Sequence, residues 1–442
     1  MARPRKNVVK NQNSLLTSDN VVEIPVEEQP YPLPEGWKWV RLYNLCSLRN
    51  GKAFKPSDWS DSGLPIIRIQ NLNNPDSKFN YYSGYIEDKF LISSGDVLFA
   101  WSGTPGTSFG AHIWYGGKAV LNQHIFRIDF KGKVILKSFF RYSINCRLEE
   151  LIAKAHGGAG LQHVTKGVFE NTPIPLPTID EQQRIVDRIE SLFAKLDEAR
   201  EKAEAVLDGF ESRKAAILHK AFTGELTAKW RTLKNISLDS WVSCPLISVL
   251  KEKPRNGYSP KPVDYKTSIK SMTLSATTSG FFRSEFFKYI DEEIPDDSHL
   301  WLSYGDILIQ RANSIEKVGT SAIYTGCEHE FIYPDLMMKL RVKSSYSYRY
   351  IAYILSTHTV LGYFRANATG TAGNMPKINQ QTVSNTPIVV PSYDEQNEIV
   401  RILDELLEKE RQVKEAAEDV LERIDLMKKA ILAKAFRGEL TR

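Results

Sequence analysis

Two stretches of the chain repeat apolar residues in alternating steps of four and three, which is the spacing of a coiled-coil seam. In residues 180–220 the seam consists of Ile185, Ile189, Leu192, Leu196, Ala199, Ala203, Val206, Phe210 and Ile217. In residues 394–434 it consists of Ile399, Leu403, Leu406, Val413, Ala417, Val420, Ile424, Met427 and Ile431. One charged residue interrupts each seam, Arg213 in the first and Glu410 in the second. The pattern predicts two helices, each about 60 Å long at a rise of 1.5 Å per residue.

The ends of both helices carry recognisable signals. Adjacent carboxylates, Asp180–Glu181 and Asp394–Glu395, lie in the first turns, where capping explains them better than acid–base chemistry. Gly224 and Gly438 follow the last turns and are the expected helix stops.

The helices belong to an internal repeat. Residues 172–186 return as residues 386–400, and residues 216–227 return as residues 430–441, both at an offset of 214. The preceding regions match only faintly. The alternative is two unrelated surface helices, but equal length and phase favour mutual pairing.

We therefore expect an α+β protein with two globular mixed α/β domains, each followed by a long helix. The two helices would pair as an antiparallel coiled coil with pseudo-twofold symmetry. The expected segments are a disordered basic arm (1–32), a first domain (33–179), a first helix (180–227), a second domain (228–393) and a second helix (394–442). Such a rod can hold two domains at the order of one DNA turn, about 34–36 Å.

Composition narrows the class of protein. The 442 residues are 42% hydrophobic and 25% charged, as in globular proteins, and no apolar run reaches the length of a membrane span. Basic residues near the start lack an apolar segment behind them, so we expect no secretory signal. The four cysteines form no CxxC pair, and we expect a reducing, cytoplasmic location in a bacterium or archaeon with no membrane partner.

The positive charge lies outside the helices. The two helical stretches contain 22 acidic and 16 basic residues, a net charge of −6, so the other 360 residues carry +11. A basic surface is the electrostatic signature of a nucleic-acid binder, although a solvated surface with a mild positive bias is the alternative.

Polar and aromatic side chains cluster in loop-like stretches of the two domains. Arginine reads guanine and asparagine or glutamine reads adenine in the major groove, while lysine more often holds phosphate. The candidate DNA-binding residues are Lys52, Lys55, Arg68, Gln70, Asn71, Trp101, Ser102, Thr104, Asn122, Gln123 and His124 in the first domain, and Arg255, Tyr258, Gln310, Arg311, Asn313, Lys317 and Lys377 in the second.

No catalytic motif accompanies them. The sequence has no phosphate-binding GxxxxGK[ST] loop, no GxGxxG after a strand and no HExxH metal motif. The eight histidines form no metal-ligand spacing, and no Asn-Pro-Pro-Tyr type of methyltransferase tetrapeptide occurs. We expect neither catalytic nor metal-binding residues.

The ordered, duplicated motifs resemble the specificity (S) subunits of type I restriction-modification systems. The residues that carry the resemblance are Leu33–Trp37, Gly95–Leu98, Asn122–Arg127, Gly158–His163, Ile174–Pro177 with Glu181–Gln182, and Lys220–Leu226. Residues 370–377 depart strongly from their counterpart at 158–163.

The resemblance implies a non-catalytic subunit that reads a bipartite site in double-stranded DNA, one half per domain. Its helices would set the spacer and dock two methyltransferase (M) subunits, which bind S-adenosylmethionine and methylate adenine. Restriction (R) subunits would add cleavage driven by ATP and Mg²⁺. The chain itself would bind no cofactor. The alternatives are a specificity subunit of a methylation-only or other split system, a coiled-coil scaffold that binds no DNA, and a fused enzyme.

Overall fold

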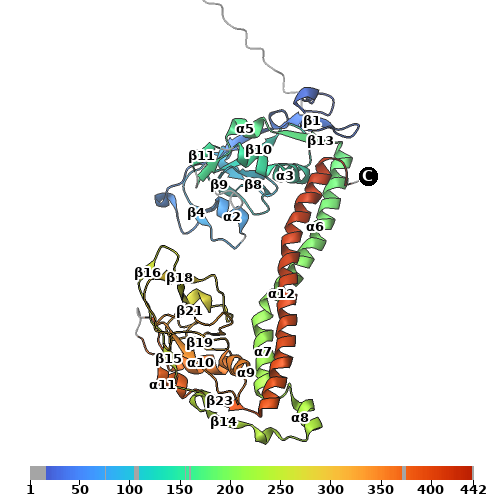
Figure 1. Ribbon diagram of the computed structural model, residues 1–442. Coiled ribbons are helices and arrows are strands. Elements are labelled where there is room, and N and C mark those ends of the chain that lie inside the picture. Colours follow the sequence, from blue (N-terminus) through green and yellow to red (C-terminus); the bar gives the residue numbers. More distant parts are fainter. Residues whose placement is uncertain are drawn as a thin grey trace, which may run out of the picture. The chain divides into compact units, whose positions relative to one another are not determined.

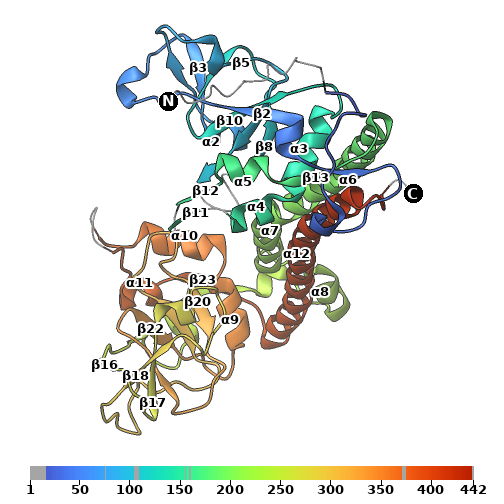
Figure 2. The same ribbon diagram turned by 90° about the horizontal axis from the view of Figure 1, so that it is seen from above.

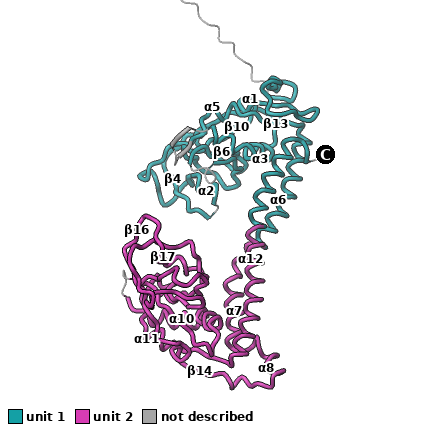
Figure 3. The backbone as a smooth tube through the Cα atoms, in the orientation of Figure 1, with its two compact units in different colours: residues 1–202, 420–442 teal, residues 203–419 magenta. Residues whose placement is uncertain are grey.

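The computed structural model describes residues 16–74, 76–103, 109–154, 156–158, 161–370 and 375–440. The chain forms two compact units, residues 1–202 with 420–442 and residues 203–419 (Figure 3). Each unit contains one mixed domain and a part of both long helices. The boundary between the units therefore crosses the helices instead of following the five segments expected from the sequence.

Unit 1 is built around two four-stranded sheets (Figure 1). One has the antiparallel order β2 (Cys46–Asn50), β10 (Ile125–Phe130), β6 (Val97–Ala100) and β8 (Gly110–Ile113). The other has the order β4 (Asn80–Tyr82), β3 (Leu64–Ile67), β9 (Ala119–Leu121) and β5 (Leu91–Ile92), in which β3 and β9 are parallel. The smaller sheets are β1 (Lys38–Arg41) with β13 (Pro173–Leu176), and β7 (Ser102–Gly103) with β12 (Leu161–His163) and β11 (His156–Gly158). The helices are α1 (Leu42–Leu45), α2 (Ile69–Asn73), α3 (Lys137–Cys146), α4 (Leu148–Ala153) and α5 (Lys166–Glu170).

Unit 2 repeats this plan. Its antiparallel sheet has the order β15 (Arg255–Asn256), β22 (Met337–Leu340), β19 (Ile307–Gln310) and β20 (Ser321–Ile323). A second sheet has the order β16 (Pro262–Val263), β18 (Phe287–Ile290), β17 (Ile269–Met272) and β21 (Phe331–Ile332), in which β17 and β21 are parallel. A two-stranded sheet joins β14 (Val242–Pro245) to β23 (Pro387–Val390), and the helices are α8 (Ala228–Lys234), α9 (Tyr348–Leu355), α10 (His358–Ala366) and α11 (Gln380–Ser384). The repeat therefore extends to the domains, whose sequences match only faintly.

The first long helix is not continuous. It divides at Gly209 into α6 (Ile179–Asp208) and α7 (Phe210–Phe222), whereas α12 (Tyr393–Phe436) is a single helix of 44 residues. The single helix expected over 180–227 is therefore wrong at this point, because glycine has the lowest helix propensity after proline. Gly224 (φ +82°) and Gly438 (φ +74°) are confirmed as left-handed stops.

The helices pair antiparallel, as Figures 1 and 2 both show. In unit 1, Asp197 pairs with Lys428 and Arg200 pairs with Asp425. Residue numbers therefore rise along one helix as they fall along the other. In unit 2, Arg213 Nε lies 2.8 Å from Glu410 Oε2. The two charged interruptions of the seams are thus each other's partners, which the sequence did not reveal.

The seam predicted from the sequence is only partly buried. Ile185 and Ile189 are buried in the core of unit 1, and Ile399 and Leu403 in the core of unit 2, so these positions fix each helix to its domain. The remaining predicted seam residues are buried (Ala203, Ala417, Ile424), partly buried (Leu192, Leu196, Ala199, Val206, Phe210, Ile217, Leu406, Ile431) or exposed (Val413, 46%; Val420, 39%; Met427, 52%). The exposed residues correct the expectation of a continuous buried stripe on the second helix, since a single partner helix does not cover all of its seam positions.

A buried glutamine ties the start of each helix to the preceding domain. Gln182 accepts from the Leu136 N–H (2.8 Å) and donates to the Pro177 carbonyl (2.9 Å). Gln396 makes the same bonds to the Ser347 N–H and the Pro391 carbonyl. These bonds satisfy amides at the N-termini of α3 and α9, which have no partner within their own helices.

Residues 16–32 are not a disordered arm, which corrects the sequence expectation. Leu16 bonds to the Lys131 carbonyl, and Ile24 bonds to the Trp39 carbonyl (2.9 Å). Val21 and Ile24 are buried in unit 1, and Glu23 between them forms an antiparallel bridge with Val40 of β1. Residues 1–15 lie outside the described residues.

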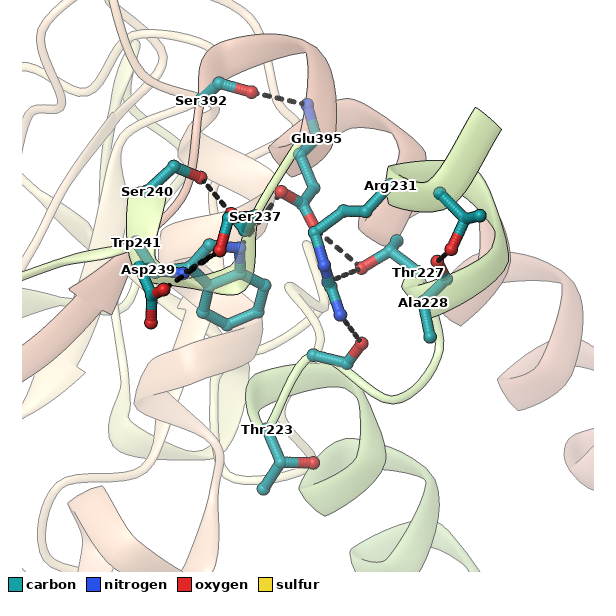
Figure 4. A network of polar contacts seen from close by, with 12 residues as sticks. Thr223, Thr227, Ala228, Arg231, Ser237, Asp239, Ser240, Trp241, Ser392 and Glu395 are labelled. Atoms are coloured by element: carbon teal, nitrogen blue, oxygen red, sulfur yellow. Dashed lines mark hydrogen bonds and ion pairs between the residues drawn. The ribbon is translucent and has the colours of Figure 1, made fainter. Parts of the chain in front are cut away.

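A buried ion pair joins α12 to α8 in unit 2 (Figure 4). Glu395 Oε1 accepts from Arg231 (2.7 Å) and from the Thr227 hydroxyl (2.7 Å), and Glu395 Oε2 accepts from the Trp241 indole (2.9 Å). Glu395 is fully buried. The expected capping role is therefore wrong for Glu395, whose carboxylate holds the linker after α7 against the second domain.

Candidate nucleic-acid interface

Strand topology gathers the candidate residues of unit 1 at one sheet edge. Because β10 runs antiparallel to β2 and β6, the residues that follow β2 and β6 lie beside those that precede β10. Lys52 and Trp101 therefore lie near Asn122–His124, and Lys52 forms a bridge with Asn122. Arg68 follows β3, which is parallel to β9, and the Asn122 N–H bonds to the Ile67 carbonyl (3.1 Å). The structure thus brings together loops that are up to 70 residues apart in the sequence.

The cations of this edge rest on aromatic rings. The Lys52 ammonium lies 4.7 Å from the centroid of the Tyr82 ring and donates to its hydroxyl (3.2 Å). The Arg68 guanidinium lies 5.6 Å from the centroid of the Trp59 ring. Lys55 and Gln70 are exposed. Such contacts hold long side chains in place while their charge remains available to an anion.

An aromatic cluster surrounds Trp101. Its ring stacks on Phe126 (5.4 Å, 22°) and lies 5.5 Å from His124 and 5.7 Å from His163. Trp101 and Phe126 line a cavity of about 300 Å³ together with Asn50, Val164, Thr165, Lys166 and Leu48. Burial, with a smaller effect of His163, lowers the pKa of His124, which favours its neutral form.

Buried polar atoms without a partner occur at this edge. Among the described residues, Trp101 Nε1 and His124 Nδ1 are buried and have no hydrogen-bond partner. Arg311 Nε and Asn256 Oδ1 are the corresponding cases at the matching edge of unit 2. Native proteins leave few such groups unpaired, so these four atoms have hydrogen-bonding capacity that the described residues do not use.

In unit 2 the corresponding edge is formed by the loop after β19 and by the segment around Lys377. Arg311 follows β19, Ala312 forms a bridge with Lys377, and the Ile378 N–H bonds to the Arg311 carbonyl (2.8 Å). Lys317 and Lys377 are exposed. Asn313 donates to Gln310 (2.6 Å) and accepts from the Ser314 N–H, so its amide shapes the loop.

Equivalent positions of the two edges hold different chemistry. In unit 1 the Val164 N–H bonds to the Trp101 carbonyl (2.9 Å), as the Ile378 N–H does to Arg311. Ser102 is paired with His163 where Ala312 is paired with Lys377. Two scaffolds of one plan therefore place Trp101 and Ser102 in unit 1 where Arg311 and Ala312 stand in unit 2.

Several candidates have structural roles. Gln310 is fully buried and donates to the Leu274 carbonyl and two threonine hydroxyls, and buried Asn71 donates to the Ser77 and Lys78 carbonyls. Buried Ser102 bonds to His163 Nδ1 (2.9 Å). The structure gives these three side chains partners inside the chain, so their polar groups hold its own loops together. Arg255 is paired with Glu252, Tyr258 donates to Glu292 (3.1 Å), Gln123 bonds to His124 (3.1 Å), and Thr104 lies outside the described residues.

Each unit has a glycine directly after its first Arg-Asn pair, Gly51 in unit 1 and Gly257 in unit 2, where the chain passes close to another backbone segment. A Cβ on Gly51 would lie 2.1 Å from the Asn122 carbonyl oxygen, and one on Gly257 would lie 2.2 Å from the Tyr333 carbonyl oxygen. The following N–H groups, of Lys52 and Tyr258, bond to the carbonyls of Leu121 and Tyr333 (2.8 and 2.9 Å). The signal in the sequence was the repeated Arg-Asn-Gly at 49–51 and 255–257.

We predict that Gly51→Ala lowers the free energy of unfolding by about 2 kcal/mol or more, because backbone atoms must move to admit the methyl group. Gly117→Ala is the control, since nothing lies within 4 Å of the added Cβ. Urea denaturation measures both. Equal stability of the two variants would show that the close approach is absent.

The described residues contain no group of three metal-ligating side chains, and they include no helix that is both long and apolar enough to cross a membrane.

The family of the chain follows from comparison with known proteins. Residues 34–206 and 258–423 match the family model described as "Type I restriction modification DNA specificity domain". The chain belongs to this family, whose role is DNA sequence specificity, and a scaffold that binds no DNA is not favoured.

Relatives cover nearly the whole chain. The specificity subunit of the EcoKI type I restriction enzyme of Escherichia coli K12 is 25% identical over 92% of this chain and 90% of its own length. The EcoBI specificity subunit of E. coli is 24% identical over 92% and 87%. A solved chain from a study of assembly and conformational transition of the type I system is similar, with a TM-score of 0.71, 20% identity, and coverage of 93% and 100%. The HsdS subunit of Thermoanaerobacter tengcongensis gives a TM-score of 0.59 at 20% identity, with coverage of 93% and 99%. These likenesses confirm the fold class expected from the sequence.

Proposed function

We propose that the chain reads a bipartite site in double-stranded DNA, with one half read at the sheet edge of each unit. The observation that carries the proposal is the pair of equivalent edges with different side chains, in which Trp101 and His163 of unit 1 stand where unit 2 has Arg311 and Lys377. A protein with two identical edges would read two copies of one sequence. Two different edges suit two different half-sites.

The remaining side chains at the edges divide by chemistry. Arg311, Asn122 and Gln70 have the donor and acceptor patterns that read base edges, and Lys52, Lys55, Arg68, Lys317 and Lys377 suit phosphate contacts. The helices would set the spacing of the half-sites and dock two methyltransferase subunits. In the complete complex, S-adenosylmethionine would belong to those subunits, and ATP with Mg²⁺ to restriction subunits. This chain would be a non-catalytic subunit.

Binding to duplex DNA at several salt concentrations tests the proposal. The affinity should fall linearly with salt on logarithmic axes, because each phosphate contact releases about one counterion. Lys317→Ala with Lys377→Ala should reduce that slope by roughly two. The control is Lys195→Ala with Lys202→Ala, which removes the same charge from α6 and should leave the slope unchanged. Binding that is absent at every salt concentration would contradict the proposal.

A further inference from the structure

The buried ion pair of unit 2 has an incomplete counterpart in unit 1. Glu181 occupies the place of Glu395, since the neighbouring Gln182 and Gln396 make the same bonds. The Glu181 N–H bonds to the Thr178 hydroxyl (3.4 Å), as the Glu395 N–H does to the Ser392 hydroxyl (3.4 Å). The two helix starts therefore have the same geometry.

The tryptophans correspond as well. Trp37 precedes β1 as Trp241 precedes β14. Their backbone N–H groups bond to the carbonyls of Pro34 (3.1 Å) and Leu238 (3.0 Å). A Cβ on Gly224 would meet Leu238, and a Cβ on Gly438 would meet Pro34. Gly438 thus stands in unit 1 where Gly224 stands in unit 2.

Within the described residues, the unit 1 site lacks a cation. Trp37 is 6% exposed, and its buried indole Nε1 has no hydrogen-bond partner. No ion pair to Glu181 forms among these residues, and Glu181 is half-buried while Glu395 is fully buried. Arg437 lies over the Tyr31 ring instead (5.7 Å). A buried donor without an acceptor destabilises the fold, so the site is suited to a ligand that draws the carboxylate inward.

We propose that Glu181 and Trp37 form a binding site for an arginine side chain, and that residues 1–15 supply it through Arg3 or Arg5. In unit 2, one nitrogen of Arg231 bonds to Glu395 and another bonds to the Gly224 carbonyl (2.6 Å). The planar guanidinium holds its N–H donors in a fixed fork, whose geometry matches both acceptors. The Gly438 carbonyl is the second acceptor in unit 1.

The length and charge of the first fifteen residues fit this role. They contain four basic residues and no acidic residue. Their anchor, Leu16, bonds to the Lys131 carbonyl (3.3 Å), and the Val134 carbonyl three residues later accepts from Gln182, the neighbour of Glu181. Arg5 precedes Leu16 by 11 residues, which reach up to about 36 Å when extended. The segment between Arg5 and Leu16 is therefore long enough to reach Glu181 along the path from Leu16 through Lys131 and Val134 to Gln182.

Nuclear magnetic resonance of the tryptophan indole N–H groups in the full-length chain tests the site. Trp37→Phe assigns the Trp37 signal, and the Trp241 signal is an internal reference. Glu181→Gln and the double variant Arg3→Gln/Arg5→Gln should each shift the Trp37 signal and speed its solvent exchange about tenfold, the loss of a charge-assisted bond. The Trp241 signal should stay unchanged.

Two control variants separate the site and the source of the arginine. Asp180→Asn removes a carboxylate from the same helical turn and should leave the Trp37 signal unchanged. Arg442→Gln, the other arginine outside the described residues, should also leave it unchanged. Rapid Trp37 exchange in the unmodified chain, or an unchanged signal in Arg3→Gln/Arg5→Gln, would overturn the proposal.

Discussion

Arg231→Ala should destabilise unit 2 by about 3–5 kcal/mol, because it leaves the Glu395 carboxylate buried without its counter-charge. Thr227 and the Trp241 indole would remain as donors, but neither carries a charge. The expected readout is a shift of one unfolding transition in urea, followed by tryptophan fluorescence, to which Trp241 contributes.

The control for this variant is Lys202→Ala. Its ion pair with Glu198 is exposed, with side chains 74% and 65% accessible, so its removal should leave the free energy of unfolding nearly unchanged. A second control replaces both members of the buried pair, Arg231→Met with Glu395→Gln, and should recover most of the lost stability. Equal effects of Arg231→Ala and Lys202→Ala would show that the pair is not buried in solution.

Exchange of residues 35–179 for the matching domain of another family member should replace one half of the recognised sequence and leave the other half unchanged. The expectation rests on the separate cores of the two units, since each domain packs its own β2- or β15-edged sheet around its own apolar cluster. The recognised sequence can be read from the DNA that the assembled methyltransferase protects or modifies.

The reciprocal exchange of residues 242–393 is the matched control and should alter only the other half. A change in both halves after either exchange would show that the two edges read the DNA jointly. Loss of all recognition in both chimaeras, with normal folding by circular dichroism, would also contradict separate reading.

The sequence predicted the helices well because their signal is periodic and repeated. The offset of 214 and the steps of four and three established two helices of equal phase, and the glycine stops were confirmed. The break at Gly209 was missed, since a single glycine within a strong heptad pattern is often tolerated. The exposed Val413 and Val420 were missed because a heptad pattern cannot tell how many helices will cover it.

The candidate interface was predicted in part. Loops that end neighbouring strands, such as those at Lys52, Trp101 and Asn122, carry polar groups that the sequence shows, and topology then brings them together. Burial is what the sequence could not show. Gln310 has the chemistry of a base reader, but the structure uses its amide to satisfy backbone and threonine groups.

The pairing of distant charges was also invisible. Glu395 looked like an ordinary first-turn carboxylate, and only the packing of the α8 linker reveals its partner Arg231, 164 residues away. The same comparison between the two halves exposed the unpaired Trp37 indole. Structural equivalence between repeats therefore located a site that neither half showed alone.

The most direct test of the central claim is a map of methylated adenines in genomic DNA with and without this gene. The account predicts that one motif disappears, that it consists of two different short sequences, and that unspecified bases separate them. The account would be contradicted if the motif that disappears were continuous or consisted of two identical half-sites. It would also be contradicted if no motif disappeared.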